Sequence, residues 1–172
     1  MDGLVMLIYH PAFDAHHSAF RQLVLLSAMP ESNADQIQLR ILDFYFLFPA
    51  ELRKVTFPNA LRKEKKQWTA LATRYNRILD PRRIFDELRA YQDEGLRMLA
   101  ATGIVRITKG SRQSSVALVE IPQSIYPMIE SARSSHANLL NLLAGEFSKI
   151  DLYGASGLKD RTGLFEYRYD AS

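Results

Sequence analysis

Apolar side chains recur at helical spacing through most of the 172-residue chain. In the segment 11–29 they return every three or four positions until Pro30, which predicts an amphipathic helix with Asp14 as its N-terminal cap. A second helix is predicted to run from the capping residues at 32–35 to Phe48. It is apolar on nearly every side, so we expect it to be central in the fold.

The middle of the chain changes from helical to strand patterning. The segment 80–102 begins with an aspartate followed by a proline, a typical helix start, and Gly103 ends its apolar periodicity. Two β-branched runs, 104–108 and 115–121, then flank a short basic turn, which predicts a hairpin. Helices followed by such a hairpin are typical of a winged helix.

The remaining segments add helices around this core. A short helix is predicted at 49–57, a basic helix at 61–79 and one long amphipathic helix at 122–150. Alternation at 164–169 indicates an edge strand or a segment bound by a partner. The predicted fold class is therefore mainly α with a small β-hairpin: a winged-helix-like core with an N-terminal helix and a long C-terminal helix. We expect a single domain, 1–172, made of an N-terminal helical segment (1–31), the core (32–121) and a C-terminal helix and tail (122–172).

The composition excludes several classes of protein. The chain has no cysteine, which rules out disulfide scaffolds, cysteine-ligated zinc and thiol nucleophiles, and fits a reducing compartment. The apolar run at 4–8 is too short for a signal peptide, and no stretch approaches the roughly 20 apolar residues of a membrane span. We expect a cytoplasmic protein that does not associate with a membrane.

Signatures of catalysis are missing from the sequence. The glycines at 154, 157 and 163 do not precede a lysine and a serine or threonine in the register of a phosphate-binding loop, so ATP hydrolysis is not expected. There is also no nucleophile elbow and no paired-histidine zinc helix. We expect a protein that is not an enzyme and needs no cofactor.

Three of the four histidines lie near the N-terminus and raise the question of a metal site. Asp14 and His17 have the three-residue spacing that places two ligands on one face of a helix. The alternative is that Asp14 caps the helix and His17 bonds to the cap or to a neighbouring loop, and the spacing favours this interpretation. A metal-dependent enzyme would need a further ligand from His10, His136 or a distant carboxylate.

The formal net charge is only +3, but basic residues concentrate between Arg53 and Arg83, where only Glu64 and Asp80 are acidic. Flexible cations on an exposed face can contact phosphates, and the alternative is a merely solvated helix face. The candidate nucleic-acid-binding residues are those of the basic helix and the hairpin: Lys63, Lys65, Lys66, Arg106, Lys109 and Arg112.

A free-standing winged-helix transcription regulator is the second interpretation, and it requires a symmetric dimer with a basic, solvent-facing recognition helix. The helix predicted before the hairpin instead carries acidic residues, namely Asp86, Glu87, Asp93 and Glu94. These acidic residues argue against reading of bases by this helix.

Short motifs in the first third of the chain connect it to a known family. They are Tyr9-His10-Pro11-Ala12-Phe13-Asp14 with His17, Phe20 and Arg21, then Ile41-Leu42-Asp43-Phe44-Tyr45 and Phe48-Pro49. With these motifs the chain resembles the small middle-component subunits of bacterial ABC-three-component systems. Among them it is most similar to the small third subunits of Lamassu-type anti-phage and anti-plasmid defence systems.

This resemblance implies a non-catalytic accessory subunit. Such a subunit binds the head or neck of an SMC- or Rad50-like ATPase and helps to couple DNA sensing to an effector nuclease. Double-stranded DNA would be a further partner within the complex. The resemblance implies that Asp14, His17 and Arg21 orient the N-terminal helix or meet a partner. The long C-terminal helix is a second candidate partner surface, through Met128, His136 and Leu140.

Overall fold

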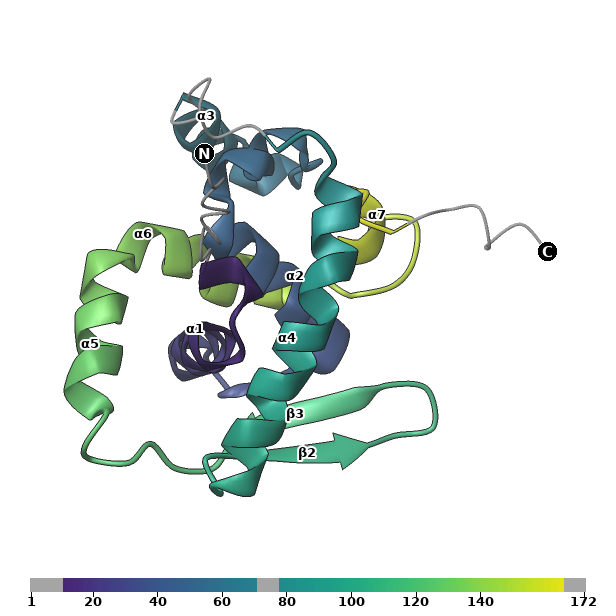
Figure 1. The fold of residues 1–172 in the computed structure, drawn as a ribbon. Coiled ribbons are helices and arrows are strands. Elements are labelled where there is room, and N and C mark those ends of the chain that lie inside the picture. The colour runs from purple at the N-terminus through teal and green to yellow at the C-terminus, as the bar shows by residue number, and fades with distance from the viewer. Residues whose placement is uncertain (1–10, 71–77, 166–172) are drawn as a thin grey trace, which may run out of the picture.

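Helix α1 (Ala15–Ala28) lies at the centre of the molecule and is seen end-on in Figure 1. The computed structural model describes residues 11–70 and 78–165. The helices that pack on α1 come from both halves of the chain: α2 (Gln36–Leu47), α4 (Pro81–Ala101) and α5 (Tyr126–Ser135). The buried apolar side chains form a cluster that extends from Ala12 to Leu164.

The first two helices begin at the caps that the sequence predicts. Asp14, which follows a 3-10 turn (Pro11–Phe13), accepts a hydrogen bond from the backbone nitrogen of His17 at 2.9 Å. Asp35 accepts from the backbone nitrogens of Ile37 and Gln38 at 2.8 and 3.4 Å. In each case a carboxylate satisfies amide groups that have no partner within the helix.

Helix α2 is central, as its pattern predicts. Five of its apolar residues are at most 1% exposed, namely Leu39, Ile41, Leu42, Phe44 and Tyr45, and the others, Ile37, Phe46 and Leu47, are partly buried. The ring of Phe44 packs edge-on against Phe85 of α4, with the ring centres 5.9 Å apart. This contact joins α2 to the helix that precedes the hairpin.

The predicted hairpin is confirmed, and it belongs to a larger sheet. Strands β1 (Asn33–Asp35), β2 (Val105–Lys109) and β3 (Ser114–Leu118) form an antiparallel sheet in the order β1-β3-β2. Val116 pairs with Ala34 on one side and Ile107 on the other, and it is fully buried. The hairpin extends beyond α4 in Figure 1. The fold is therefore mainly helical with a small sheet, as predicted, although the sequence did not predict β1.

Helix α4 begins at the predicted aspartate cap, Asp80, and ends before Gly103, whose φ of +75° suits glycine. A glycine inside the helix allows a close approach to α1. A Cβ atom on Gly95 would lie 2.8 Å from the backbone nitrogen of Ala19 and 3.0 Å from the carbonyl oxygen of Ala15. Only glycine permits this spacing of the two helices.

Between α2 and α4 the chain forms short helical pieces. They are two 3-10 helices, η2 (Pro49–Lys54) and η3 (Asn59–Leu61), and helix α3 (Arg62–Ala70). The short helix predicted at 49–57 is thus a 3-10 helix. Residues 71–77 of the basic helix predicted at 61–79 lie outside the described residues. Figure 1 shows α3 at the opposite end of the molecule from the hairpin.

The prediction of one continuous helix over 122–150 is wrong. The chain bends at His136 (φ −118°, ψ 27°), and Figure 1 shows it changing direction there. The pieces are α5, α6 (Ala137–Leu140), a π-helical turn η5 (Asn141–Glu146) and a 3-10 turn η6 (Phe147–Lys149). The bend lets the two halves cover different sides of the core, since α5 packs on α1 whereas η5 packs on both α1 and α2. A straight helix would keep its buried residues along one line.

A short helix, α7 (Leu158–Thr162), completes the described chain and is joined to the segment after η2. The backbone nitrogen of Thr56 donates to the carbonyl oxygen of Arg161 at 2.9 Å. Leu164 and Phe165 are not in a strand, and the rest of the strand predicted at 164–169 lies outside the described residues. No helix in the described ranges is long and apolar enough to cross a membrane.

Candidate functional site

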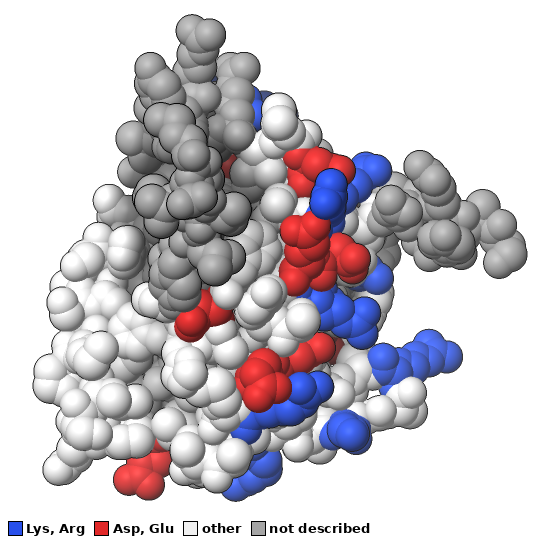
Figure 2. Space-filling view, viewed as in Figure 1, with Lys and Arg blue, Asp and Glu red and all other residues white. Residues whose placement is uncertain are grey.

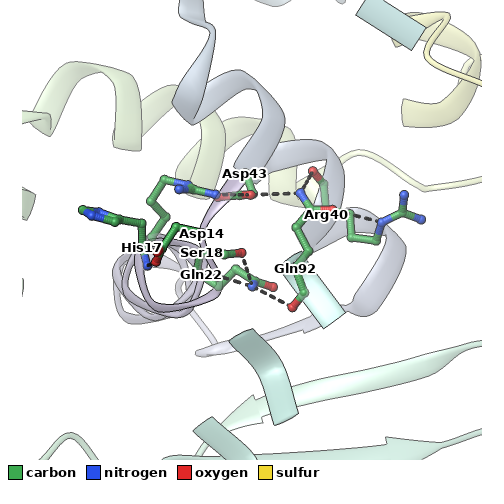
Figure 3. A network of polar contacts seen from close by, with 8 residues as sticks. Asp14, His17, Ser18, Gln22, Arg40, Asp43 and Gln92 are labelled. Atoms are coloured by element: carbon green, nitrogen blue, oxygen red, sulfur yellow. Dashed lines mark hydrogen bonds and ion pairs between the residues drawn. The ribbon is translucent and has the colours of Figure 1, made fainter. Parts of the chain in front are cut away.

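A network of polar side chains is buried where α1, α2 and α4 meet (Figure 3). Arg21 of α1 donates from Nε to Oδ1 of Asp43 at 2.7 Å and from Nη2 to Oδ2 at 3.1 Å. Asp43 of α2 is 0% exposed and Arg21 is 8% exposed. Because the two parallel hydrogen bonds have a fixed geometry, this ion pair sets the orientation of α1 against α2.

Gln92 connects the third helix to this ion pair. Its amide nitrogen donates to Oδ2 of Asp43 at 2.9 Å and to the carbonyl oxygen of Arg40 at 3.2 Å, while its Oε1 accepts from Nε of Arg40 at 3.1 Å. Gln22 of α1 donates to the backbone carbonyl of Gln92 at 3.1 Å and to Oγ of Ser18 at 3.0 Å. Polar groups of three helices thus bond to one another inside the core, which favours one arrangement of these helices, although Oε1 of Gln22 is buried without a hydrogen-bond partner.

A groove of about 440 Å³ opens on the far side of this network, between α2, α4 and the hairpin turn. Its charged lining consists of three arginines, Arg40, Arg89 and Arg112, and one carboxylate, Asp93. The guanidinium of Arg40 points away from Asp43, and Figure 3 shows its terminal amino groups beyond the network. Burial, followed by the charge of Arg89, lowers the pKa of Arg40.

The three predicted N-terminal partner residues do not form one exposed surface. Arg21 points inward to Asp43, and Asp14 caps α1, while the side chain of His17 is exposed. The cap is the alternative that the sequence favoured over a metal site. Within residues 11–70 and 78–165 no group of three or more histidine, aspartate and glutamate side chains is placed to hold a metal ion.

Replacing Asp14 with alanine should lower the free energy of unfolding by about 1 kcal/mol, because the variant loses the hydrogen bond to the first turn of α1. Asp14→Asn should keep most of the stability, since asparagine is an equally good cap. Urea unfolding followed by circular dichroism measures both variants. An equal loss in the two would show that the charge, and not the cap, stabilises this end of the helix.

The residues predicted on the C-terminal helix lie on both sides of it. Met128 is 57% exposed on α5, and Tyr126, 50% exposed, lies beside it in the first turn. His136 is exposed at the bend and meets the ring of Phe46 edge-on at 5.3 Å. Leu140 is 3% exposed and packs in the core. A partner contact at this surface would therefore involve Met128 and His136 more directly than Leu140.

The predicted nucleic-acid-binding residues separate into two groups at opposite ends of the molecule (Figure 1). The hairpin residues are all exposed, and they are Arg106, Lys109 and Arg112. Lys63 and Lys66 are exposed on α3, but Nζ of Lys65 donates to the carbonyl oxygen of Val55 at 2.8 Å. The two groups do not form one continuous basic surface.

The outward face of α4 carries charges of both signs. Arginines pair with carboxylates on the same helix, Arg83 with Glu87 at 2.8 Å and Arg97 with Glu94 at 2.9 Å. Figure 2 shows acidic and basic side chains interspersed along α4, whereas the hairpin carries only basic ones in this view. Of these two elements, the hairpin and not α4 carries an excess of positive charge.

The exposed cations of the hairpin were predicted from the sequence, but the groove behind them was not. Arg21 was predicted without its partner Asp43, and neither Arg40 nor Gln92 was predicted. The available signal was the presence of Arg40 and Asp43, three residues apart, in the strongly apolar part of this helix that begins at Leu39. Charged residues at such positions are usually paired when they are buried.

These features define a mainly helical protein with a small antiparallel sheet, a buried polar network and a basic hairpin. No curated protein and no solved structure matches the chain. Residues 7–170 match the family MC5, described as ABC-three component (ABC-3C) system Middle Component 5. The chain belongs to this family, which confirms the predicted middle component of an ABC-three-component system. The finer resemblance to Lamassu third subunits stays a prediction.

Proposed function

We propose that this chain is a non-catalytic accessory subunit that binds the ABC-type ATPase of its own three-component system. The observation that carries the proposal is the match to a middle-component family over nearly the whole chain. In this proposal the ATPase is SMC- or Rad50-like, the system is a Lamassu-type defence system, and the subunit helps to couple DNA sensing to an effector nuclease.

The order of the elements supports a winged-helix-like core. A helix, a short strand, two principal helices and a hairpin follow one another as α1, β1, α2, α4, β2 and β3. The strand after the first helix pairs with the second strand of the hairpin, and the hairpin extends beyond the helix before it. The chain adds α3 and the segment after residue 121 to this core.

Within the complex, the hairpin is the proposed DNA contact. Arg106, Lys109 and Arg112 are exposed there, and such cations suit phosphates, which carry no sequence information. The mixed charge of α4 disfavours the alternative of a free-standing transcription regulator, because a recognition helix must present donors to base edges in an anionic groove.

Helix α5 is the proposed surface for the ATPase. Its two exposed apolar residues, Tyr126 and Met128, share the first turn, and its charged residues Glu130 and Arg133 pair with each other at 3.4 Å. Figure 2 shows that this side of the molecule has few charged side chains. An apolar centre with paired charge around it is typical of protein interfaces.

Co-expression of the chain with the ATPase of the same locus should give one stoichiometric complex in size-exclusion chromatography with light scattering at moderate salt. Met128→Glu should weaken this complex at least about tenfold, because it introduces a charge into the apolar centre of the interface. Met128→Leu should bind normally. Leu79→Glu is the matched control, since it also replaces an exposed apolar side chain with glutamate, but at a fully exposed position outside α5.

One combination of results would contradict the proposed function. A chain that fails to join the ATPase, runs alone as a dimer and shifts duplex DNA with a steep salt dependence would overturn the proposal and favour the regulator.

A further inference from the structure

We propose that the groove between α2, α4 and the hairpin turn binds a phosphate of the DNA backbone, with Arg40 as its buried anchor and Arg89 and Arg112 at its rim. The inference rests on the proposed contact between the hairpin and DNA. It assigns the tightest contact to residues behind the hairpin instead of to its exposed cations alone.

Arg40 is a buried cation whose charge is only partly satisfied by the protein. It is 8% exposed, its Nε donates to Gln92, and its guanidinium carbon lies 4.7 Å from the centre of the Phe85 ring. In the described ranges no acceptor is bonded to its terminal amino groups, and no carboxylate lies within ion-pair distance. Figure 3 shows these groups directed away from Asp43 and Gln92, and Arg40 is one of the residues that line the groove. A buried arginine with open donors is suited to hold an anion.

The neighbouring charges leave the groove positive. Asp93 is its one acidic lining residue, against three arginines, and its Oδ1 already accepts from Nε2 of Gln36 at 3.1 Å. Its other oxygen lies 3.9 Å from Nε of Arg89, which is longer than a hydrogen bond. Like charges held close together and partly out of water repel one another, and a bound anion relieves this repulsion. Burial and then the charge of Arg89 lower the pKa of Arg40, and they outweigh the opposite effect of the carboxylates of Asp93 and Asp86.

The rest of the lining favours phosphate over an acidic peptide. The hairpin turn supplies small or polar residues, namely Gly110, Ser111, Gln113 and Ser114. Ile37 and Phe165 are the large apolar lining residues, so the groove offers little to the side chains of a peptide. A guanidinium offers paired donors that match phosphate oxygens. Lys109, at the end of the adjoining strand and next to the turn, is exposed and can contact the next phosphate, whereas Arg106 is exposed on the other face of that strand.

The test measures binding of the full-length chain to a short fluorescein-labelled duplex by anisotropy at several salt concentrations. Arg89→Gln and Arg112→Gln should each weaken binding about tenfold and reduce the slope of log K against log salt by about 1. Arg83→Gln on α4 is the matched control, because it removes the same charge from an exposed, paired arginine that does not line the groove, and it should bind like the unmodified chain.

Arg40→Lys adds a sharper test, because lysine keeps the charge but lacks the planar fork of the guanidinium. It should also weaken DNA binding about tenfold. Since Arg40 belongs to the core network, the free energy of unfolding of the Arg40→Lys variant is measured in parallel. The exposed variants at 89 and 112 decide the proposal even if the lysine variant is unstable.

Three results would overturn the inference. One is that the variants at 89 and 112 bind duplex DNA as tightly as Arg83→Gln, and the second is that the unmodified chain does not bind the duplex. The third is that these variants lose binding to a polyglutamate peptide but not to the duplex, which would make the groove a peptide site. Assembly with the ATPase is measured on the same proteins, and failure of the unmodified chain to assemble would count against the proposed function and not against the groove.

Discussion

Replacing Asp43 with alanine should lower the free energy of unfolding by about 3–5 kcal/mol, the cost of removing one partner of a buried ion pair. Asp43 is fully buried, and its carboxylate accepts hydrogen bonds from Arg21 and Gln92. The substitution removes this carboxylate while the guanidinium remains inside the core. Domains of this size have a total stability of only about 5–15 kcal/mol, so the variant is expected to be close to unfolded at 37 °C.

Urea unfolding measured by circular dichroism and tryptophan fluorescence gives the size of the effect. The double variant Arg21→Met, Asp43→Leu should recover most of the loss, because it removes the charge and its partner together. Glu94→Ala is the surface control. It breaks an exposed pair with Arg97 and should cost less than about 1 kcal/mol. A loss below 1 kcal/mol for Asp43→Ala would contradict the importance of the network.

The second large effect is expected at Gly95, where alanine should destabilise the protein by about 1–3 kcal/mol. In an exposed helix the same change would stabilise by about 1 kcal/mol. The sign reverses here because the new methyl group would lie 2.8 Å from a backbone atom of α1, and backbone cannot move aside as the end of a side chain can. The two helices must separate, which loosens the most extensive contact between helices in the described part of the chain.

The same substitution at Gly145 is the matched control. A Cβ atom there would have no heavy atom within 4 Å, so Gly145→Ala should be neutral or stabilising by up to about 1 kcal/mol. Differential scanning calorimetry of the two variants compares them directly. If both raise the melting temperature, the close approach of α1 and α4 does not limit the stability of the fold.

The helices that the sequence predicted well are those with local start and stop signals. Asp14, Asp35 and Asp80 act as caps through hydrogen bonds within three residues. Pro30 and Gly103 follow the ends of α1 and α4, and they do not continue a helix for local steric reasons. Such signals are visible without knowledge of the tertiary structure. The hairpin was predicted for the same reason, since its two strands are close together in the sequence.

The elements that were missed depend on distant contacts. Strand β1, with the sequence Asn-Ala-Asp, has no strand propensity and forms because Ala34 pairs with Val116. The bend at His136 interrupts a continuous apolar period because the two halves cover different elements. In both cases tertiary packing overrides the local pattern.

The same distinction between local features and distant contacts applies to the candidate site. Exposed cations on a hairpin turn are a local feature, and Lys109 and Arg112 were found. Arg40 was not found, because its importance comes from Gln92, 52 residues further along the chain, and from a turn that lies further still. Sequence spacing alone cannot show that these residues converge.

The central position of α1 also bears on how the chain is synthesised. This helix is the first described α-helix to leave the ribosome, but its packing partners include η5, near residue 143. Its apolar surface is therefore covered only after most of the chain has been translated, and until then it is available to chaperones and to other nascent chains. A truncation after the hairpin would leave the same surface exposed permanently, so the segment that follows the sheet is part of the folding unit and not an appendage.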